Sequence, residues 1–120
     1  TAYAQERVQF GRKISAHQAI RHSIAERRTQ LQAMRHMLYH AAWLADQNRP
    51  CSVETSMSKL FCCEMASEVT QSAMRVAGAY GLSDQFDFER YTRDAISLPI
   101  VGGSSNMQKN NIANRLRLES

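Results

Sequence analysis

The chain has 120 residues, of which 43% are hydrophobic and 22% charged, and its 15 Lys and Arg against 11 Asp and Glu give a formal net charge of +4. A chain of this length buries one core but does not divide comfortably into two, so we expect residues 1–120 to form a single domain. No apolar run approaches the ~18 residues of a membrane helix and no segment has the pattern of a signal peptide. We therefore expect no membrane span and a cytoplasmic location, or the mitochondrial matrix in a eukaryote.

The first predicted elements are helical. The segment TAYAQERVQFG, which begins at Thr1, has the character of a helix already under way, so we expect the 120 residues to be part of a longer chain. From about Ala16 to Gln47, apolar residues recur at steps of three, four or seven, which predicts a helix of about 30 residues. Its apolar face consists of Ile20, Ile24, Leu31, Met34, Leu38, Ala41 and Ala45.

A second long helix is predicted after Pro50, because the residue before a proline is pushed out of helical geometry. Ser52 is its expected N-cap. An apolar stripe that begins at Val53 predicts that the helix ends near Gly78 or Gly81. Two long antiparallel helices joined by a short turn form the centre of a helical bundle.

Two shorter helices complete the pattern. Ser83 or Asp84 is expected to begin one that runs through FDFERYTRDAI, and a loop around Gly102 and Gly103 separates it from a last amphipathic helix over residues 106–118. No segment has the alternation of a strand. We therefore predict an all-α fold, an up-down bundle of about four helices built on the two long ones.

Patterns that could indicate a metal, redox or nucleic-acid site are better explained by ordinary helical surfaces. His36 and His40 share a helix face, but zinc needs at least a third ligand and the glutamate of the metalloprotease helix is missing. Cys62 and Cys63 point about 100° apart on a helix, so we expect reduced thiols. The basic residues of the first third spread around the helix and are interrupted by Glu6 and Glu26, unlike a nucleic-acid surface. We expect no metal and no nucleic acid.

The segment ERVQFGRKISAHQ suits a ligand that has both a phosphate and a planar ring. A break at Gly11 would gather several polar and aromatic side chains around one turn. They are Arg7, Gln9, Phe10, His17 and Gln18. Arginine pairs with phosphate and stacks on flat groups. The alternative is a capped corner in which Phe10 fills the core.

Five short motifs occur in order along the chain. They are Arg7-x-x-Phe10-Gly11, His17-Gln18, Gly78-x-Tyr80-Gly81, Arg93-Asp94-Ala95 and Gly103-Ser104-Ser105-x-x-Gln108. In this order and spacing they resemble the C-terminal helical domain of the flavin-dependent acyl-CoA dehydrogenases, from about Ala2 to Leu118. Each motif alone is weakly specific, whereas the ordered set is strongly specific.

The resemblance implies a full-length FAD enzyme with a helical and a β domain upstream, which dehydrogenates an acyl-CoA thioester and passes electrons to an electron-transferring flavoprotein. It also implies a homodimer or tetramer, with a hetero-oligomer as the alternative, in which the first motif reaches the FAD of a neighbouring subunit. This domain alone is not expected to be active. The residues that the resemblance assigns to FAD are Arg7, Gln9, Phe10, His17, Gln18, Arg75, Gly78, Ser104 and Asn106.

The chain departs from the family pattern in three places: the loop after the second long helix, Ser104 and Gly102. Arg75 stands where the family usually has glutamine, and Ala79 where it has its second glycine. Arginine still pairs with phosphate. Ser104 replaces the usual threonine and keeps the hydroxyl.

The most consequential departure is Gly102, which stands where many members carry a glutamate. In those members the glutamate removes the α-proton of the thioester while hydride leaves the β-carbon for the flavin. Glycine has no side chain to accept a proton, so no catalytic residue is predicted within this chain. Two hypotheses remain open. The base comes from the helix upstream of Thr1, as in members resembling isovaleryl-CoA and long-chain dehydrogenases, or the protein is a non-catalytic partner subunit or helical interaction module.

The two glycines of this loop also have a predicted structural role. They allow the backbone to approach a flat cofactor or thioester and to adopt positive φ. The alternative is a plain connector between two helices.

Overall fold

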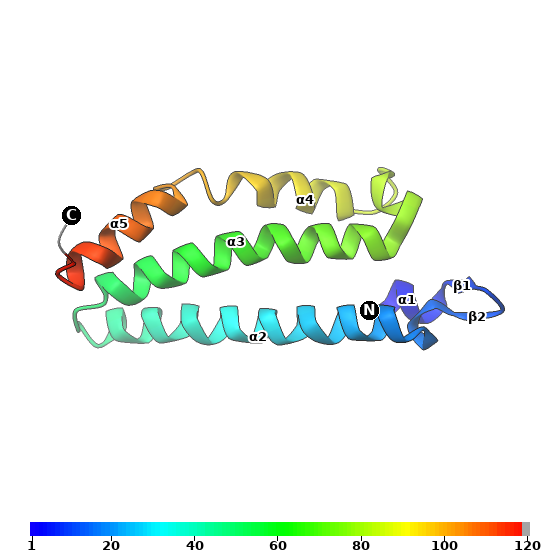
Figure 1. Ribbon diagram of the computed structural model, residues 1–120, viewed down its shortest axis with the longest axis horizontal. Coiled ribbons are helices and arrows are strands. Elements are labelled where there is room, and N and C mark those ends of the chain that lie inside the picture. The colour runs from blue at the N-terminus through cyan, green and yellow to red at the C-terminus, as the bar shows by residue number, and fades with distance from the viewer. Residues whose placement is uncertain (119–120) are drawn as a thin grey trace.

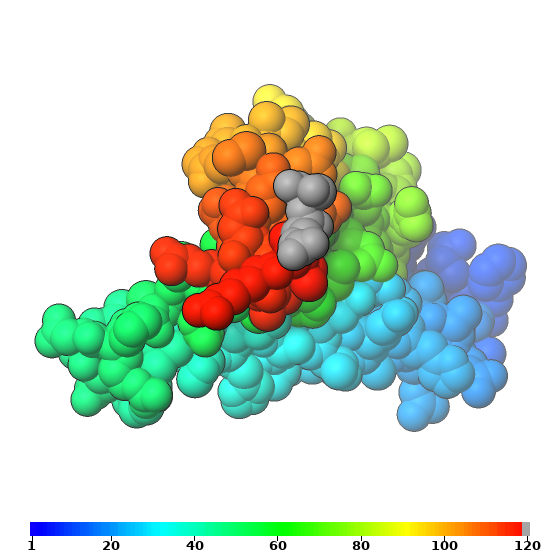
Figure 2. Space-filling model, turned by 60° about the vertical axis from the view of Figure 1, so that its left-hand side comes forward, coloured from blue at the N-terminus to red at the C-terminus, as the bar shows by residue number. Residues whose placement is uncertain are grey.

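The computed structural model describes residues 1–118 as an elongated helical bundle with extents of 57 × 27 × 23 Å (Figure 1). The long helices α2 (Gln18–Asp46) and α3 (Ser52–Ala77) run antiparallel, and α4 (Phe88–Ser97) and α5 (Ser105–Arg115) follow one another along the other side of α3. The central layer is therefore α3. Figure 2 shows α5 lying over the start of α3, far from the N-terminal hairpin. The predicted all-α bundle is confirmed.

The N-terminal segment differs from the prediction. It comprises α1 (Ala2–Glu6), the strands β1 (Val8–Gln9) and β2 (Arg12–Lys13), and the 3₁₀ turn η1 (Ile14–Ala16). The helices do break around Gly11, but the first one ends at Glu6 rather than at this glycine, and the expected absence of strands was wrong. Phe10 and Gly11 have φ values of 54° and 74°, the left-handed pair that joins two strands of a tight hairpin. Strands of two residues are too short to produce a detectable alternation.

Several predicted boundaries move by a few residues. Ser52 is the first residue of α3 rather than its N-cap, and Cys51 takes the cap position without a side-chain hydrogen bond. After α3 the chain forms the 3₁₀ turn η2 (Gly78–Leu82). Ser83 donates to the Tyr80 carbonyl and thus completes η2 instead of starting α4, which begins at Phe88 after Asp87.

The ends of α3 and α5 depend on individual residues. Gly78 follows α3 with φ 63°, so the predicted stop near this glycine is confirmed. Ser104 caps α5, since its hydroxyl accepts a hydrogen bond from the Met107 amide at 3.4 Å. Arg117 adopts φ 55° beyond the last turn, so α5 ends before residue 118.

The seam between α2 and α3 is narrow and rich in small residues. The hydroxyls of Ser23 and Ser72 lie 3.1 Å apart, and Arg27 forms a 2.9 Å ion pair with Glu68. The hydrogen bond to Glu68, and a second one to Glu26, raise the pKa of Arg27. The buried apolar residues of the described chain are Ala4, Ile14, Ala41, Leu44, Ala77 and Ala95.

Part of the predicted apolar face of α2 is not buried. Leu31 and Leu38 are 38% and 55% exposed, whereas Ala41 and Leu44 form the buried seam. Burial of an apolar helix face as wide as the predicted one requires packing partners on more than one side of the helix. In the described residues, α3 covers a narrower strip.

The other sequence patterns have local explanations. His36 lies 3.1 Å from the Gln32 side chain and His40 stacks on Trp43. Within residues 1–118 no group of three or more His, Cys, Asp or Glu is placed to hold a metal ion. The cysteines are free thiols, and Cys62 contacts the Met34 carbonyl. None of the helices within this range has both the length and the apolar character to cross a bilayer.

Candidate functional site

The nominated residues of the first motifs lie at the end of the bundle opposite the α2–α3 turn (Figure 1). The hairpin that carries Gln9 and Phe10 leaves α1 at Arg7 and returns to the start of α2. The Ile14 amide closes it by donating to the Arg7 carbonyl at 2.8 Å. The strand register pairs Gln9 with Arg12, which places a second arginine beside the tip.

His17 holds the hairpin against the first turn of α2. Arg12 Nη2 donates to His17 Nδ1 at 3.2 Å, and His17 Nε2 lies 3.2 Å from the Gln9 carbonyl oxygen. The Phe10 ring meets the imidazole edge-on at 5.9 Å. Because both ring nitrogens have partners, the structural role of His17 is to orient the hairpin tip.

The Phe10 side chain points into solvent. It is 92% exposed, so the alternative in which it fills the core was wrong. Full burial of a phenylalanine contributes about 1.5–3 kcal/mol, which this ring does not gain within the chain. Phe10 is thus available for contact with another molecule.

Arg7 joins the first motif to the glycine motif after α3. Its guanidinium lies 5.5 Å from the centre of the Tyr80 ring, a cation–π contact. The Tyr3 hydroxyl donates to the Ala77 carbonyl at 3.1 Å, across 74 positions of sequence. Gly81 allows η2 to pack on α3, since a β-carbon there would lie 2.8 Å from the Met74 carbonyl oxygen.

Arg75 lies at the same end of the bundle. It lines one surface depression with Ala19 and another with Glu64, whereas Arg7 lines a different one with Tyr80. In the described chain, seven of the nominated residues therefore lie toward this end of the bundle without a shared cavity, and we call them the hairpin group. They are Arg7, Gln9, Phe10, His17, Gln18, Arg75 and Gly78.

Ser104 and Asn106 lie elsewhere, at the end of the α4–α5 connection and in the first turn of α5, and with Gly102 and Gly103 we call them the loop group (Figure 1). This connection contacts α3 at Glu64, which precedes Ala77 by 13 positions, about 20 Å along a helix. The chain alone does not bring the two groups together.

Two further residues of this end, Arg12 and Tyr80, were not predicted as site residues from the sequence. Both belong to the hairpin end, Arg12 through its bond to His17 and Tyr80 through its stacking with Arg7. Arg12 could have been found from the strand pairing, because a two-residue turn at Phe10-Gly11 places Arg12 opposite Gln9.

Comparison with known proteins identifies the fold. Residues 1–117 match the family model described as "Acyl-CoA dehydrogenase, C-terminal domain". The chain belongs to the acyl-CoA dehydrogenase family. Among curated members it is 40% identical over 115 residues to the probable acyl-CoA dehydrogenase YngJ of Bacillus subtilis, covering 96% of this chain and 30% of that protein. It is also 40% identical over 107 residues to the benzylmalonyl-CoA dehydrogenase of Aromatoleum aromaticum, covering 89% and 28%.

Solved members of the family have the same bundle. Butyryl-CoA dehydrogenase from Megasphaera elsdenii superposes with a TM-score of 0.94 and 29% identity, over 97% of this chain and 30% of that one. An FAD complex of PigA gives a TM-score of 0.94 and 30% identity, over 99% and 31%. The chain thus spans about 30% of the length of the relatives that it matches.

Proposed function

We propose that this chain is the C-terminal domain of an FAD-dependent acyl-CoA dehydrogenase that catalyses α,β-dehydrogenation of an acyl-CoA thioester. The domain contributes FAD contacts, one wall of the acyl pocket and an assembly surface. The observation that carries the proposal is the meeting of Arg7 with Tyr80 at the base of the hairpin whose tip exposes Phe10, which unites two motifs of the family at one end of the bundle. Its relatives include a protein solved as an FAD complex and a benzylmalonyl-CoA dehydrogenase, which supports the proposal.

The hairpin group fits FAD chemically. Arg7 and Arg12 supply positive charge for a pyrophosphate at the hairpin, and Arg75 supplies it in a separate depression on α3. Arginine pairs with phosphate oxygens through two parallel N–H donors. Phe10 supplies an exposed aromatic face for a planar ring. Gly78, at φ 63° and with no atom within 4 Å of a built β-carbon, leaves the backbone open to close approach. FAD, when bound, supplies the acceptor for the hydride.

The separation of the two groups favours assembly. The hairpin and loop groups lie at different places along the bundle, so one FAD does not contact both groups of the same chain. In this proposal the hairpin group contacts an FAD bound by a neighbouring copy, and the loop group contacts the FAD of its own chain. A homodimer or a dimer of dimers satisfies this geometry. The proposed acceptor of the electrons is an electron-transferring flavoprotein. The proposed location is the cytoplasm, or the mitochondrial matrix in a eukaryote.

The loop group supplies backbone rather than a base. Gly102 adopts φ 64°, a conformation that disfavours any side chain, so the loop is built for glycine at the position where a carboxylate would act. The proton acceptor of the proposed enzyme is therefore a residue outside this loop. The same observation supports the second candidate function, a partner subunit that keeps the fold and has no base.

Spectroscopy of the full-length protein separates these functions. We expect it to purify with a flavin spectrum that an acyl-CoA bleaches anaerobically and that an electron-transferring flavoprotein restores. A flavin spectrum that no acyl-CoA bleaches, at any chain length tested, would favour the partner subunit. A folded but colourless protein that also fails to take up added FAD would contradict both the cofactor and the enzyme.

A further inference from the structure

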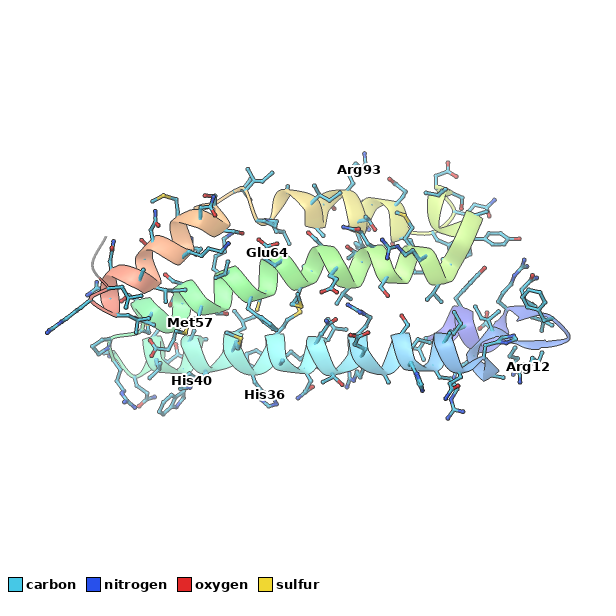
Figure 3. The ribbon with its side chains drawn as sticks, viewed as in Figure 1. Arg12, His36, His40, Met57, Glu64 and Arg93 are labelled. Atoms are coloured by element: carbon cyan, nitrogen blue, oxygen red, sulfur yellow. The ribbon has the colours of Figure 1, made fainter. Side chains whose placement is uncertain are left out.

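The loop between α4 and α5 is fixed at both ends by side chains of α3. Lys59 Nζ donates a hydrogen bond to the Leu98 carbonyl at 2.7 Å. At the other end the Ser105 hydroxyl donates to the Glu64 carboxylate. Figure 3 shows Glu64 on the side of α3 that faces this connection. One helix therefore sets the position of both ends of the loop.

The interior of the loop is fixed from α5. The Gln108 side chain is 8% exposed, and its Nε2 donates to the Gly103 carbonyl at 3.1 Å. A β-carbon on Gly103 would lie 2.7 Å from that nitrogen, so the contact requires glycine. The Ser105 amide closes the base of the loop by donating to the Pro99 carbonyl at 2.9 Å.

These contacts leave the tip of the loop open to a ligand. Ile100 and Val101 are 69% and 54% exposed. Within residues 1–118 the amide N–H groups of Gly102 and Gly103 donate no hydrogen bond. The loop thus presents two backbone donors and two exposed apolar side chains, while Lys59 and Gln108 support its glycines from within the chain.

We propose that Lys59 and Glu64 are positioning residues for the dehydrogenation, because they hold this loop so that its glycine backbone lies against the acyl thioester. This inference rests on the proposed function. Neither side chain contacts substrate. Lys59 acts through Leu98, with its Cε 3.9 Å from a β-carbon built on Gly102, and Glu64 acts through Ser105.

The magnitude of the effect follows from the geometry. A displacement of about 1 Å at a reacting group costs up to about 100-fold in rate. Loss of one end contact lets the loop move while Gln108 still holds Gly103, so we expect about a tenfold loss for each residue.

The test uses the full-length protein and compares Lys59→Met with the conservative variant Lys59→Arg. Lys109→Met, at an exposed position on α5, is the matched control. Two measurements are made on each: hydrogen–deuterium exchange of the peptide over residues 98–105, and kcat and KM for an acyl-CoA. In Lys59→Met we expect faster loop exchange and about a tenfold lower kcat at unchanged FAD content, with both values restored in Lys59→Arg.

A second variant keeps the test decisive if Lys59→Met does not fold. Glu64→Ala is expected to have the same two effects, and Glu64→Gln, which still accepts the Ser105 hydrogen bond, to have neither. Exchange of the α2 peptides must stay as in the wild type, which shows that the bundle is intact.

Two outcomes overturn the proposal. Loop exchange in Lys59→Met and Glu64→Ala that equals that of Lys109→Met shows that the contacts do not hold the loop. Faster exchange with unchanged kcat shows that holding the loop does not serve the reaction. Failure of the proposed function is visible separately, because acyl-CoA then does not reduce the flavin of the wild type.

Discussion

The turn at the hairpin tip and the turn in the α4–α5 loop each place two successive residues at positive φ, but they present different groups. At the hairpin Phe10 and Gly11 have φ values of 54° and 74°, and at the loop Gly102 and Gly103 have 64° and 91°. A left-handed conformation costs a non-glycine residue about 1–2 kcal/mol. The hairpin accepts this cost and projects a ring, whereas the loop omits both side chains and exposes backbone.

The two turns also differ in what supports them. The hairpin is held by its own strand pairing and by His17 in the next helix, all within a short stretch of sequence. The loop is held by Lys59 and Glu64 from a helix some 40 positions away, and by Gln108. The comparison indicates that the hairpin tolerates change elsewhere in the bundle, while the loop depends on tertiary packing.

The largest expected effect is at Gly103. In Gly103→Ala the new β-carbon meets Gln108 at 2.7 Å in a backbone at φ 91°, so we expect a loss of about 1–3 kcal/mol in the free energy of unfolding and a severe loss of flavin reduction. Gly102→Ala is the matched control. Its φ of 64° lies within the left-handed helical region, and the nearest atom to its β-carbon is 3.9 Å away, so the cost is smaller on both counts. Equal costs, measured by denaturant unfolding of the full-length protein, would show that neither the contact with Gln108 nor the wider φ of Gly103 adds to the cost.

The next effect is at Arg7. In Arg7→Ala the proposed pyrophosphate contact and the stacking on Tyr80 are both lost, so we expect FAD affinity to fall by about 10- to 100-fold with little change in stability. Titration of the FAD-free full-length protein with FAD measures it. Arg21→Ala, an exposed arginine of α2, serves as the control. An unchanged affinity would remove Arg7 from the site.

A smaller effect is expected at Phe10. Because the ring is 92% exposed, Phe10→Ala should leave the free energy of unfolding within about 0.5 kcal/mol of the wild type while FAD affinity falls about tenfold. Ile96→Ala, which removes a 53% exposed side chain of α4, should change neither. If Phe10→Ala clearly destabilised the monomeric protein, in which no neighbouring subunit is bound, the ring would pack inside its own subunit.

The smallest effect is expected at the seam between α2 and α3, the two helices that support the hairpin and the loop. Glu68→Gln removes the ion pair with Arg27 and should lower the thermal midpoint without favouring either turn. The pKa of Arg27 is raised, so its contribution is fully present below the ordinary arginine value and is lost only above it. Titration of Arg27 should therefore not change the difference in thermal midpoint between wild type and variant from about pH 6 to pH 9. If hydrogen exchange in Glu68→Gln became faster in the α4–α5 loop alone, the seam would support the loop and not both turns.

The long helices could be predicted because their signals are local. The proline after Arg49 and the glycine after Ala77 set the ends of α2 and α3 to within a few residues. The hairpin could not be predicted, since its two-residue strands carry no periodic signal and its turn begins with Phe10 rather than the usual Asn or Gly. Ser83 was misplaced because its hydroxyl satisfies the preceding turn, a contact that propensity does not encode.

The sequence by itself determined the helical class, the glycine positions that need positive φ, and the ordered motifs that mark the family. The glycine positions can be recognised from the sequence because glycine is the residue that adopts positive φ without strain at its β-carbon. Only the tertiary structure decided that Arg7 meets Tyr80 while Ser104 lies about 20 Å along the bundle, and that Lys59 and Glu64 hold the loop. These contacts join distant parts of the chain, and packing of α3 between its neighbours, rather than any local preference, brings them together.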